Sequence, residues 1–317
     1  MSGIKIVGTG LALPQKVVSN EALSKTIDTS DEWIFSRTGI HSRYIAGEGE
    51  NVYSLAKEAA QKAIEKAAKQ DEEFSKEKIK AVFAATMTSD HIFPSVACML
   101  QKELGLEKDI KAFDISAACT GFVYALQTAY GTFCAGCEEY ILVLGAECMS
   151  SILNFQDRST CVLFGDGAGA AILKKDHRKE SCFLEISGTE GNDEVLFCEK
   201  KEDFIHMNGG QVYRFATKAL RGAIQQLLEK SQNTMDDIDY LVCHQANARI
   251  IDSVKRKYPG QEEKFFMNME HFANTSAASV AIAMADMYEK EILKPGMKII
   301  TAAFGAGLSW SGILMTI

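Results

Sequence analysis

Cys119 is the residue whose surroundings most favour reactivity. It lies in residues 113–122 (FDISAACTGF), between a run that predicts a strand and one that predicts a helix. At such a turn the unpaired N–H groups of the helix and the positive end of its dipole stabilise a thiolate, and Gly121 allows close backbone approach. Cys119 alone is equally consistent with a small core cysteine. With its downstream partners it predicts a nucleophile.

Two polar residues far downstream could act with this thiol. His244 follows the apolar run 238–243, and Asn274 precedes the small residues 275–279 (TSAAS). Both side chains offer neutral N–H donors, which stabilise the enolate left when a malonyl thioester loses carbon dioxide. The cysteine would carry a second acyl group as a thioester. The set predicts carbon–carbon bond formation on thioesters, although a structural histidine and an N-cap asparagine are the alternatives.

The elements that must position these residues follow one pattern twice. In the first half, apolar spacing predicts a helix at 53–69, strands at 79–85, 111–115 and 140–145, and a helix from 119 to about 134. In the second half it predicts helices at 213–230 and from Asn274 to about 290, and strands at 238–243, 265–269 and 298–303. Cys119 and Asn274 then occupy equivalent helix starts.

This duplication predicts an α/β fold with pseudo-twofold halves. Alternating strands and helices indicate largely parallel sheets covered by helices. The pattern breaks near 171–182, where residues 174–180 are strongly charged. We therefore expect an N-terminal half at 1–175 with the cysteine and a C-terminal half at 176–317 with the histidine and asparagine.

Bulk composition limits the partners and the compartment. The 317 residues carry a net charge of -8, which gives no general attraction to nucleic acid or anionic membranes. The nine cysteines lack secreted-type spacing, and Cys98, Cys161, Cys182 and Cys243 lie in apolar runs, which predicts buried, reduced thiols. With neither a signal peptide nor a long apolar span, we expect a cytoplasmic protein.

Six motifs in order resemble those of one enzyme family. They are residues 31–34 with 37–40 (DEWI, RTGI), the Cys119 turn, 157–160 leading to 164–169 (DRST, FGDGAG), 244–247 (HQAN), 274–279 (NTSAAS), and the Gly305 loop with Trp310. The chain resembles the β-ketoacyl-ACP synthase III family of the thiolase superfamily nearly end to end. These enzymes initiate bacterial type II fatty acid synthesis.

The resemblance implies a fold, a reaction and a set of site residues. The fold would be the thiolase-like α-β-α-β-α arrangement. Cys119 would be acylated by a short acyl-CoA, and His244 and Asn274 would promote decarboxylation of malonyl-ACP, giving 3-oxoacyl-ACP. The implied contacts are an oxyanion hole from the N–H groups of Cys119 and Ala306; a coenzyme A site of Trp33, Arg37, Arg158, Gly209 and Asn247; and an acyl pocket of Phe93, Phe304 and Leu308.

The resemblance also implies partners. The family is homodimeric, and Phe93 would cross the interface to the partner's acyl pocket. Coenzyme A thioesters would be substrates, with no metal or other cofactor. A local basic face in this acidic protein would meet the acidic acyl carrier protein. Its predicted residues are Arg214, Gln245, Arg249, Arg256 and Lys257, although a solvated helix face explains the same charges.

Some positions depart from the family pattern, and some alternatives stay open. Ala273 and Ala306 stand where glycine is usual, which restricts the backbone beside Asn274 and in the oxyanion loop. A related condensing or acyl-transfer enzyme of secondary metabolism is the first alternative. A non-catalytic module that binds acyl carriers is the second. The choice among acetyl, propionyl and branched primers depends on pocket packing.

Overall fold

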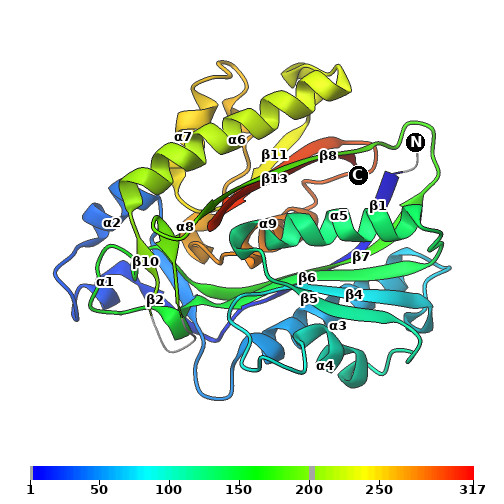
Figure 1. Ribbon diagram of the computed structural model, residues 1–317, viewed down its shortest axis with the longest axis horizontal. Helices are drawn as coiled ribbons and strands as arrows, with labels where there is room; N and C mark the ends of the chain where they lie inside the picture. Colours follow the sequence, from blue (N-terminus) through cyan, green and yellow to red (C-terminus); the bar gives the residue numbers. More distant parts are fainter. Residues whose placement is uncertain (1–2, 200–203) are drawn as a thin grey trace.

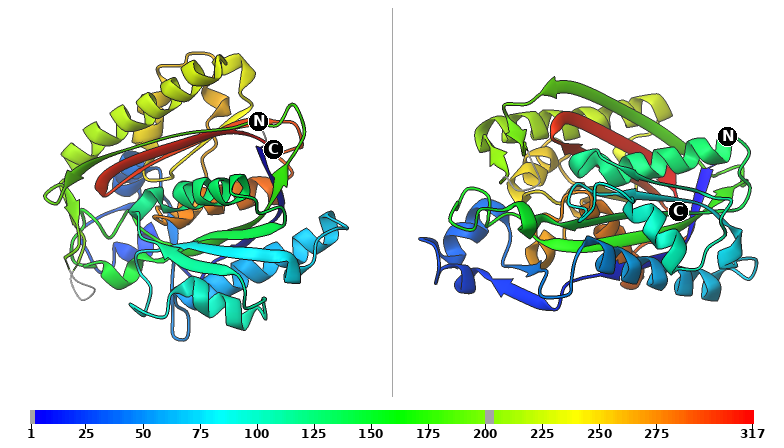
Figure 2. Two further views of the ribbon diagram at one scale, coloured as in Figure 1. Left: turned by 45° about the vertical axis from the view of Figure 1, so that its right-hand side comes forward. Right: turned by 60° about the horizontal axis from the view of Figure 1, so that its bottom comes forward.

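Two β-sheets enclose a pair of helices, and further helices cover the outer face of each sheet. The computed structural model describes residues 3–199 and 204–317. Its layers are helices α3 (Val52–Gln70) and α4 (Val96–Glu103), the first sheet, helices α5 (Gly121–Cys134) and α9 (Ala278–Glu289), the second sheet, and helices α6 (Gly209–Ser231) and α7 (Ala248–Lys255) (Figure 1). The views in Figure 2 keep this order. The predicted five-layer arrangement is confirmed.

The first sheet is built from the N-terminal half. Its order is β1 (Gly3–Ala12), β7 (Asp166–Asp176), β6 (Tyr140–Cys148), β4 (Ile79–Ala85) and β5 (Lys111–Ile115). β7 runs antiparallel to both neighbours, whereas β4 is parallel to β6 and β5. The predicted strands at 79–85 and 111–115 have their expected bounds, and the third extends to Cys148. β6 is buried throughout, as expected for a central strand covered on both faces.

The second sheet repeats this topology. Its order is β8 (Phe183–Asn192), β13 (Gly307–Thr316), β12 (Lys298–Gly305) and β11 (Tyr240–Cys243), with antiparallel, antiparallel and parallel pairings. The first sheet, taken from β1, has the same sequence of pairings. At the place of β5 there is only one parallel bridge, between Leu241 and Phe265. The predicted strand at 265–269 is therefore wrong as an element, although its first residue pairs where expected.

Helices α5 and α9 form the central layer because their surfaces are apolar nearly all round. Residues 278–287 of α9 are all buried. α9 approaches the first sheet closely at Gly145, where a Cβ would lie 2.5 Å from the carbonyl oxygen of Ala277. The expected start of this helix at Asn274 is wrong, since α9 begins at Ala278. Residues 274–277 instead form the turn that leads into it.

The outer helices are amphipathic. α3 buries small residues at 56, 59, 60, 63 and 67 against the first sheet, and a capping box of Asn51 and Ser54 starts it. α6 begins at Gly209 behind the N-cap Asn208, four residues earlier than predicted. The predicted helices at 53–69 and 213–230 are both present. Residues 177–182 connect the two sheets and overlap the charged segment 174–180.

Short elements gather at one end of the layers, on the left of Figure 1. They are β2 (Lys16–Ser19), α1 (Asn20–Leu23), α2 (Asp31–Thr38), β3 (Ser42–Ile45), β9 (Leu196–Phe197), β10 (His206–Met207) and α8 (Met269–Phe272). Among the described residues, no helix is both long and apolar enough to cross a membrane.

No disulfide forms among the cysteines that the structure describes. Cys161 and Cys243 are buried as predicted, but Cys98 is exposed and Cys182 is half-buried. Cys98 lies on the solvent side of α4, which buries Val96, Ala97 and Leu100 instead. The apolar run around Cys98 thus did not imply burial, because only one face of a helix packs inward.

Candidate active site

One cavity of about 630 Å³ collects the reactive side chains of both halves. Cys119, His244 and Asn274 all line it, together with Phe304, Gly305 and Ala306. Cys119 follows β5, His244 follows β11, and Asn274 precedes α9. The duplicated topology therefore brings three distant residues to one place between the sheets.

Cys119 lies in a 3₁₀ turn, Ala118–Thr120, between β5 and α5. Ala118 has a φ of 45°, so this turn takes the left-handed conformation that L-residues rarely adopt. The thiol donates a hydrogen bond to Ser276 Oγ at 3.5 Å. Burial raises the pKa of Cys119 to about 12. This direction is opposite to the stabilised thiolate that the helix start predicts, because desolvation favours the protonated thiol.

His244 is buried in its neutral form. Burial lowers the pKa of the imidazole to about 3. Nδ1 lies 2.5 Å from the hydroxyl of Ser279, which also accepts the Gln245 N–H at 3.4 Å. In the tautomer in which the Ser279 hydroxyl donates to Nδ1, the ring proton lies on Nε2. The Phe304 ring packs edge-on against the imidazole, with centroids 5.2 Å apart.

Asn274 is fixed by its backbone and by one end of its side chain. Its N–H donates to Leu163 O at 2.9 Å, and its carbonyl accepts the Gly165 N–H at 3.0 Å. Oδ1 accepts the Ser276 N–H at 2.9 Å. This bond engages the amide oxygen and leaves the NH₂ group as the end that can donate.

The connection before Asn274 shows the effect of the alanine noted in the sequence. Ala273 has a φ of 57° and a ψ of -161°, a region that is essentially restricted to glycine. In the other loop, Ala306 is not among the residues with positive φ; that conformation falls on Gly307, with a φ of 139°. The Ala273 departure therefore strains the backbone, whereas the Ala306 departure does not.

The turn between β12 and β13 comes close to the cysteine. A Cβ at Gly305 would lie 2.9 Å from the backbone nitrogen of Cys119. Only glycine permits this approach. This approach places the backbone of the cysteine turn beside that of Gly305, and both turns line the cavity.

Cationic and aromatic residues form the outer part of the cavity. The guanidinium groups of Arg37 and Arg158 lie 4.5 Å and 4.6 Å from the centroid of the Trp33 ring. Arg158 also donates to the Asp28 carbonyl at 2.6 Å. The side-chain amide of Asn247 donates to Arg37 O and accepts from Arg249 N–H. Gly209, Arg214 and Arg249 complete this part of the lining.

Several predicted site residues lie elsewhere. Leu308 is buried in the core of the second sheet, not in the cavity lining, because it packs with the α6 and α7 face. Gln245 is also buried, and its amide bonds to Cys243 O, Phe266 O and Asn268 N. A docked protein cannot reach it, so its assignment to the carrier surface is wrong.

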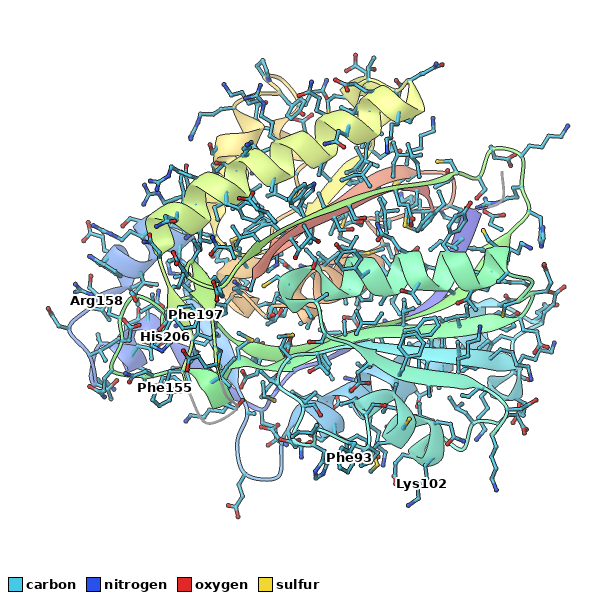
Figure 3. All side chains as sticks on the ribbon, viewed as in Figure 1. Phe93, Lys102, Phe155, Arg158, Phe197 and His206 are labelled. Atoms are coloured by element: carbon cyan, nitrogen blue, oxygen red, sulfur yellow. The ribbon has the colours of Figure 1, made fainter. Side chains whose placement is uncertain are left out.

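The remaining predicted residues lie on the surface. Phe93 is 84% exposed and lies beside α4, away from Arg158 (Figure 3). Arg256 directly follows α7, and Lys257 borders a separate groove between α6 and α7. This groove, of about 400 Å³, also exposes Lys218 and Arg221. The described residues contain no cluster of three or more side chains suited to a metal ion.

Sequence reasoning missed four residues around the nucleophile. The Cys119 thiol bonds to Ser276, which in turn bonds to Glu147. His244 bonds to Ser279, and Met87 lines the cavity. The positions of the two serines, two and five residues after Asn274, offered a signal. Glu147 offered another, since it is an acid in an otherwise apolar strand.

Comparison with known proteins identifies the family. Residues 113–191 match the family model described as 3-Oxoacyl-[acyl-carrier-protein (ACP)] synthase III, and residues 228–317 match its C-terminal counterpart. The chain is 42% identical over 328 residues to β-ketoacyl-[acyl-carrier-protein] synthase III of Clostridium beijerinckii, covering 99% of each.

Solved structures agree with this. The crystal structure of 3-oxoacyl-[acyl-carrier-protein] synthase III from Aquifex aeolicus is 39% identical, with a TM-score of 0.93 and coverage of 99% of this chain and 100% of that one. The priming β-ketosynthase of the R1128 polyketide pathway is 31% identical, with a TM-score of 0.91 and coverage of 99% and 96%. These matches show that the chain, whose cavity brings together Cys119, His244 and Asn274, belongs to the β-ketoacyl-[acyl-carrier-protein] synthase III family.

Proposed function

We propose that this protein condenses a short acyl-CoA primer with malonyl-ACP, releasing carbon dioxide and forming 3-oxoacyl-ACP to initiate fatty acid synthesis. The observation that carries the proposal is the convergence of one thiol and two neutral amide or imidazole donors on a single cavity. Membership of the family supports the same reaction. The chemistry takes coenzyme A thioesters as substrates and needs no metal.

The first half-reaction acylates the cysteine. Cys119 Sγ attacks the acyl-CoA carbonyl, and the oxygen of the tetrahedral intermediate becomes negative. The backbone N–H groups of Cys119 and Ala306 would donate to that oxygen, which the close approach at Gly305 supports. Coenzyme A then leaves as the thiol.

The second half-reaction uses the two neutral donors. Decarboxylation of malonyl-ACP places negative charge on the thioester oxygen. His244 Nε2–H and the Asn274 NH₂ group would both donate to it, since Ser279 and Ser276 hold their other ends. Burial keeps the imidazole uncharged, so its contribution is a fixed hydrogen bond rather than a proton. The resulting carbanion attacks the Cys119 thioester.

Trp33, Arg37 and Arg158 form the candidate nucleotide site for coenzyme A. Because Arg158 already stacks on the Trp33 ring at 4.6 Å, an adenine between them must displace it. The Arg158 side chain is 44% exposed and can swing outward. Gly209 lines the cavity, and the side-chain amide of Asn247 donates to the backbone carbonyl of Arg37.

An acidic carrier protein would dock on the basic residues beside the cavity. Arg214 and Arg249 line the cavity, and Arg256 and Lys257 directly follow α7. Charge complementarity would steer the phosphopantetheine arm toward Cys119. We further propose a cytoplasmic homodimer whose chains divide into halves at 1–175 and 176–317.

Mass spectrometry after incubation with acetyl-CoA tests the proposal. We expect one acetyl group on Cys119, followed by 3-oxoacyl-ACP once malonyl-ACP is added. Failure to turn over malonyl-ACP would contradict the proposal, and an unmodified cysteine would favour a carrier-binding module. Likeness to the polyketide priming ketosynthase makes an enzyme of secondary metabolism the second candidate. A panel of primers and malonyl donors distinguishes the two and identifies the primer.

A further inference from the structure

A buried carboxylate, that of Glu147, accepts a hydrogen bond from Ser276, the residue that bonds to the Cys119 thiol. Glu147, in β6, is fully buried. Oε2 accepts from the Thr88 hydroxyl at 2.5 Å, from the Met87 and Thr88 N–H groups at 3.0 and 3.1 Å, and from the Thr86 hydroxyl at 3.3 Å. Oε1 accepts from the Ser276 hydroxyl at 3.2 Å. Every one of these partners donates, so the ionised carboxylate is the form that fits.

Ser276 joins this carboxylate to Cys119. Its hydroxyl hydrogen points to Glu147, so its lone pairs are free to accept the Cys119 thiol hydrogen at 3.5 Å. Its N–H is bound to Asn274 Oδ1, and its φ is 48°. These bonds hold Ser276 in one conformation. In the hydrogen-bond series Cys119–Ser276–Glu147, each hydrogen is directed toward the carboxylate.

The acylation step requires such an acceptor. Burial favours the protonated form of the Cys119 thiol and raises its pKa to about 12. In the tautomer in which Ser279 donates to Nδ1, the His244 ring carries its own proton on Nε2 and has no free lone pair for the cysteine proton. Within the described part of the chain, Ser276 makes the only side-chain hydrogen bond to the thiol.

We propose that Ser276 is a further catalytic residue that accepts the Cys119 proton during acylation, and that Glu147 is the positioning residue that receives the Ser276 proton in turn. As the Sγ–C bond forms, the thiol proton moves to Ser276 Oγ and the serine proton moves to Glu147 Oε1. As the coenzyme A C–S bond breaks, the proton returns through Ser276, which lines the cavity, to the departing sulfur. The step converts the Cys119 thiol and the acyl-CoA thioester into the Cys119 thioester and the coenzyme A thiol.

Two features support this assignment. Burial raises the pKa of Glu147 above its ordinary value, which favours transient protonation. The same carboxylate binds the Met87 N–H, and Met87 lines the cavity, so Glu147 fixes the nucleophile relative to the cavity wall. The inference rests on the proposed function, since it concerns the acylation of Cys119 by acyl-CoA.

The test compares Ser276→Ala with Thr275→Val. Thr275 is buried beside Ser276, but its hydroxyl has no hydrogen-bond partner among the described residues, so the valine variant removes a hydroxyl without breaking a bond. Rapid-quench mass spectrometry measures Cys119 acylation by acetyl-CoA. Loss of a proton acceptor should slow acylation about 10²-fold in Ser276→Ala. Thr275→Val should match the unmodified protein.

A second measurement separates catalysis from structure. Preacylated enzyme is mixed with malonyl-ACP, and carbon dioxide release is followed in a single turnover. Ser276→Ala should slow this half-reaction far less than acylation, whereas Ser279→Ala, which releases His244, should show the opposite pattern. Equal slowing of both half-reactions by Ser276→Ala, or unchanged acylation, would overturn the inference.

Glu147→Gln tests the second residue of the chain. Its amide NH₂ would donate to Ser276, so the serine could no longer pass a proton inward, and acylation should slow about tenfold or more, in line with loss of general-base catalysis. Acylation as fast as in the unmodified protein would refute the role of Glu147. A wild-type protein that forms no acyl-enzyme would instead overturn the proposed function itself. The Ser276→Ala result stands even if Glu147→Gln fails to fold.

Discussion

Two neutral donors line the cavity, and each is held at its far end by a neighbouring serine. Burial lowers the pKa of His244 from 6.5 to about 3. For Asn274 the amide never titrates, and Oδ1 is bound to the Ser276 N–H. A charged imidazole would attract the enolate more strongly, but it would first have to be desolvated. The site therefore works with dipoles that are already oriented.

The neutral histidine gives a prediction for stability against pH. In the unfolded chain the imidazole takes up a proton near pH 6.5, whereas in the folded protein it does so only near pH 3. Acid therefore favours the unfolded state. As the pH falls between these two pKa values, His244 should lower the free energy of unfolding by up to about 1.4 kcal/mol per pH unit.

Urea unfolding of the unmodified protein and of His244→Gln, between pH 7 and pH 4.5, measures this contribution. The glutamine variant should lose the slope that His244 contributes. Parallel curves for the two proteins would show that the imidazole takes up a proton as readily in the folded state as in the unfolded state.

Asn274→Ala should act on one half-reaction. Removing one of two enolate donors should slow carbon dioxide release about 10²–10³-fold, as for the loss of an oxyanion donor. Acylation of Cys119 should change much less, and single-turnover assays of the two steps measure the difference. Equal losses in both steps would mean that Asn274 serves mainly to hold Ser276.

At the level of elements, the reactive residues lie on connections rather than inside helices or strands. Cys119 lies in the turn from β5 to α5, His244 after β11, and Asn274 between α8 and α9. Rigid sheets fix the ends of these connections, and the connections accept unusual backbone angles. Ala118, Ala273 and Ser276 all have positive φ, and all three are at or next to a site residue.

Ala273→Gly should stabilise the protein. The alanine has a φ of 57° and a ψ of -161°, which costs about 1–3 kcal/mol in a residue with a Cβ. Glycine removes this strain but loses a buried methyl group and adds freedom to the unfolded chain, each worth about 1 kcal/mol or less. We expect a net gain of about 1 kcal/mol by urea unfolding. Ala277→Gly is the matched control, because Ala277 is equally buried but has the common right-handed backbone conformation, with a φ of -59° and a ψ of -27°. Ala277→Gly should lower the free energy of unfolding. If Ala273→Gly lowers it by the same amount, the strain argument is refuted.

The sequence predicted regular elements well and connections poorly. Helix α3 and strands β4 and β5 were found because their apolar periodicity reflects direct packing. The start of α9 was misplaced because Asn274 is a residue type that often caps a helix and residues 275–277 are small, like the helix that follows. The Ser276–Glu147 contact joins residues 129 positions apart, and no local pattern could reveal it.

At the scale of the whole molecule, one edge of the first sheet is left open in the isolated chain. β5 is the edge strand, and its Phe113 is 42% exposed. On the neighbouring loop Ile92 and Phe93 are 91% and 84% exposed. Unpaired strand edges and clustered apolar side chains are costly in water, so they favour a protein interface. This surface supports the proposed homodimer, in which Phe93 would reach the partner's acyl pocket.

Phe113→Asp should therefore weaken the dimer and the activity together. A carboxylate on the edge strand would meet its own copy across a twofold interface, and like charges directly opposite destabilise strand pairing. Light scattering after gel filtration should show a shift from twice 34.8 kDa toward 34.8 kDa. Phe155→Asp is the control, since Phe155 is 38% exposed and lies near Arg158, away from Phe93 (Figure 3). It should remain dimeric. If Phe113→Asp is monomeric but condenses the same primers at the wild-type rate, each chain has a complete acyl pocket and Phe93 does not contribute to its partner's site.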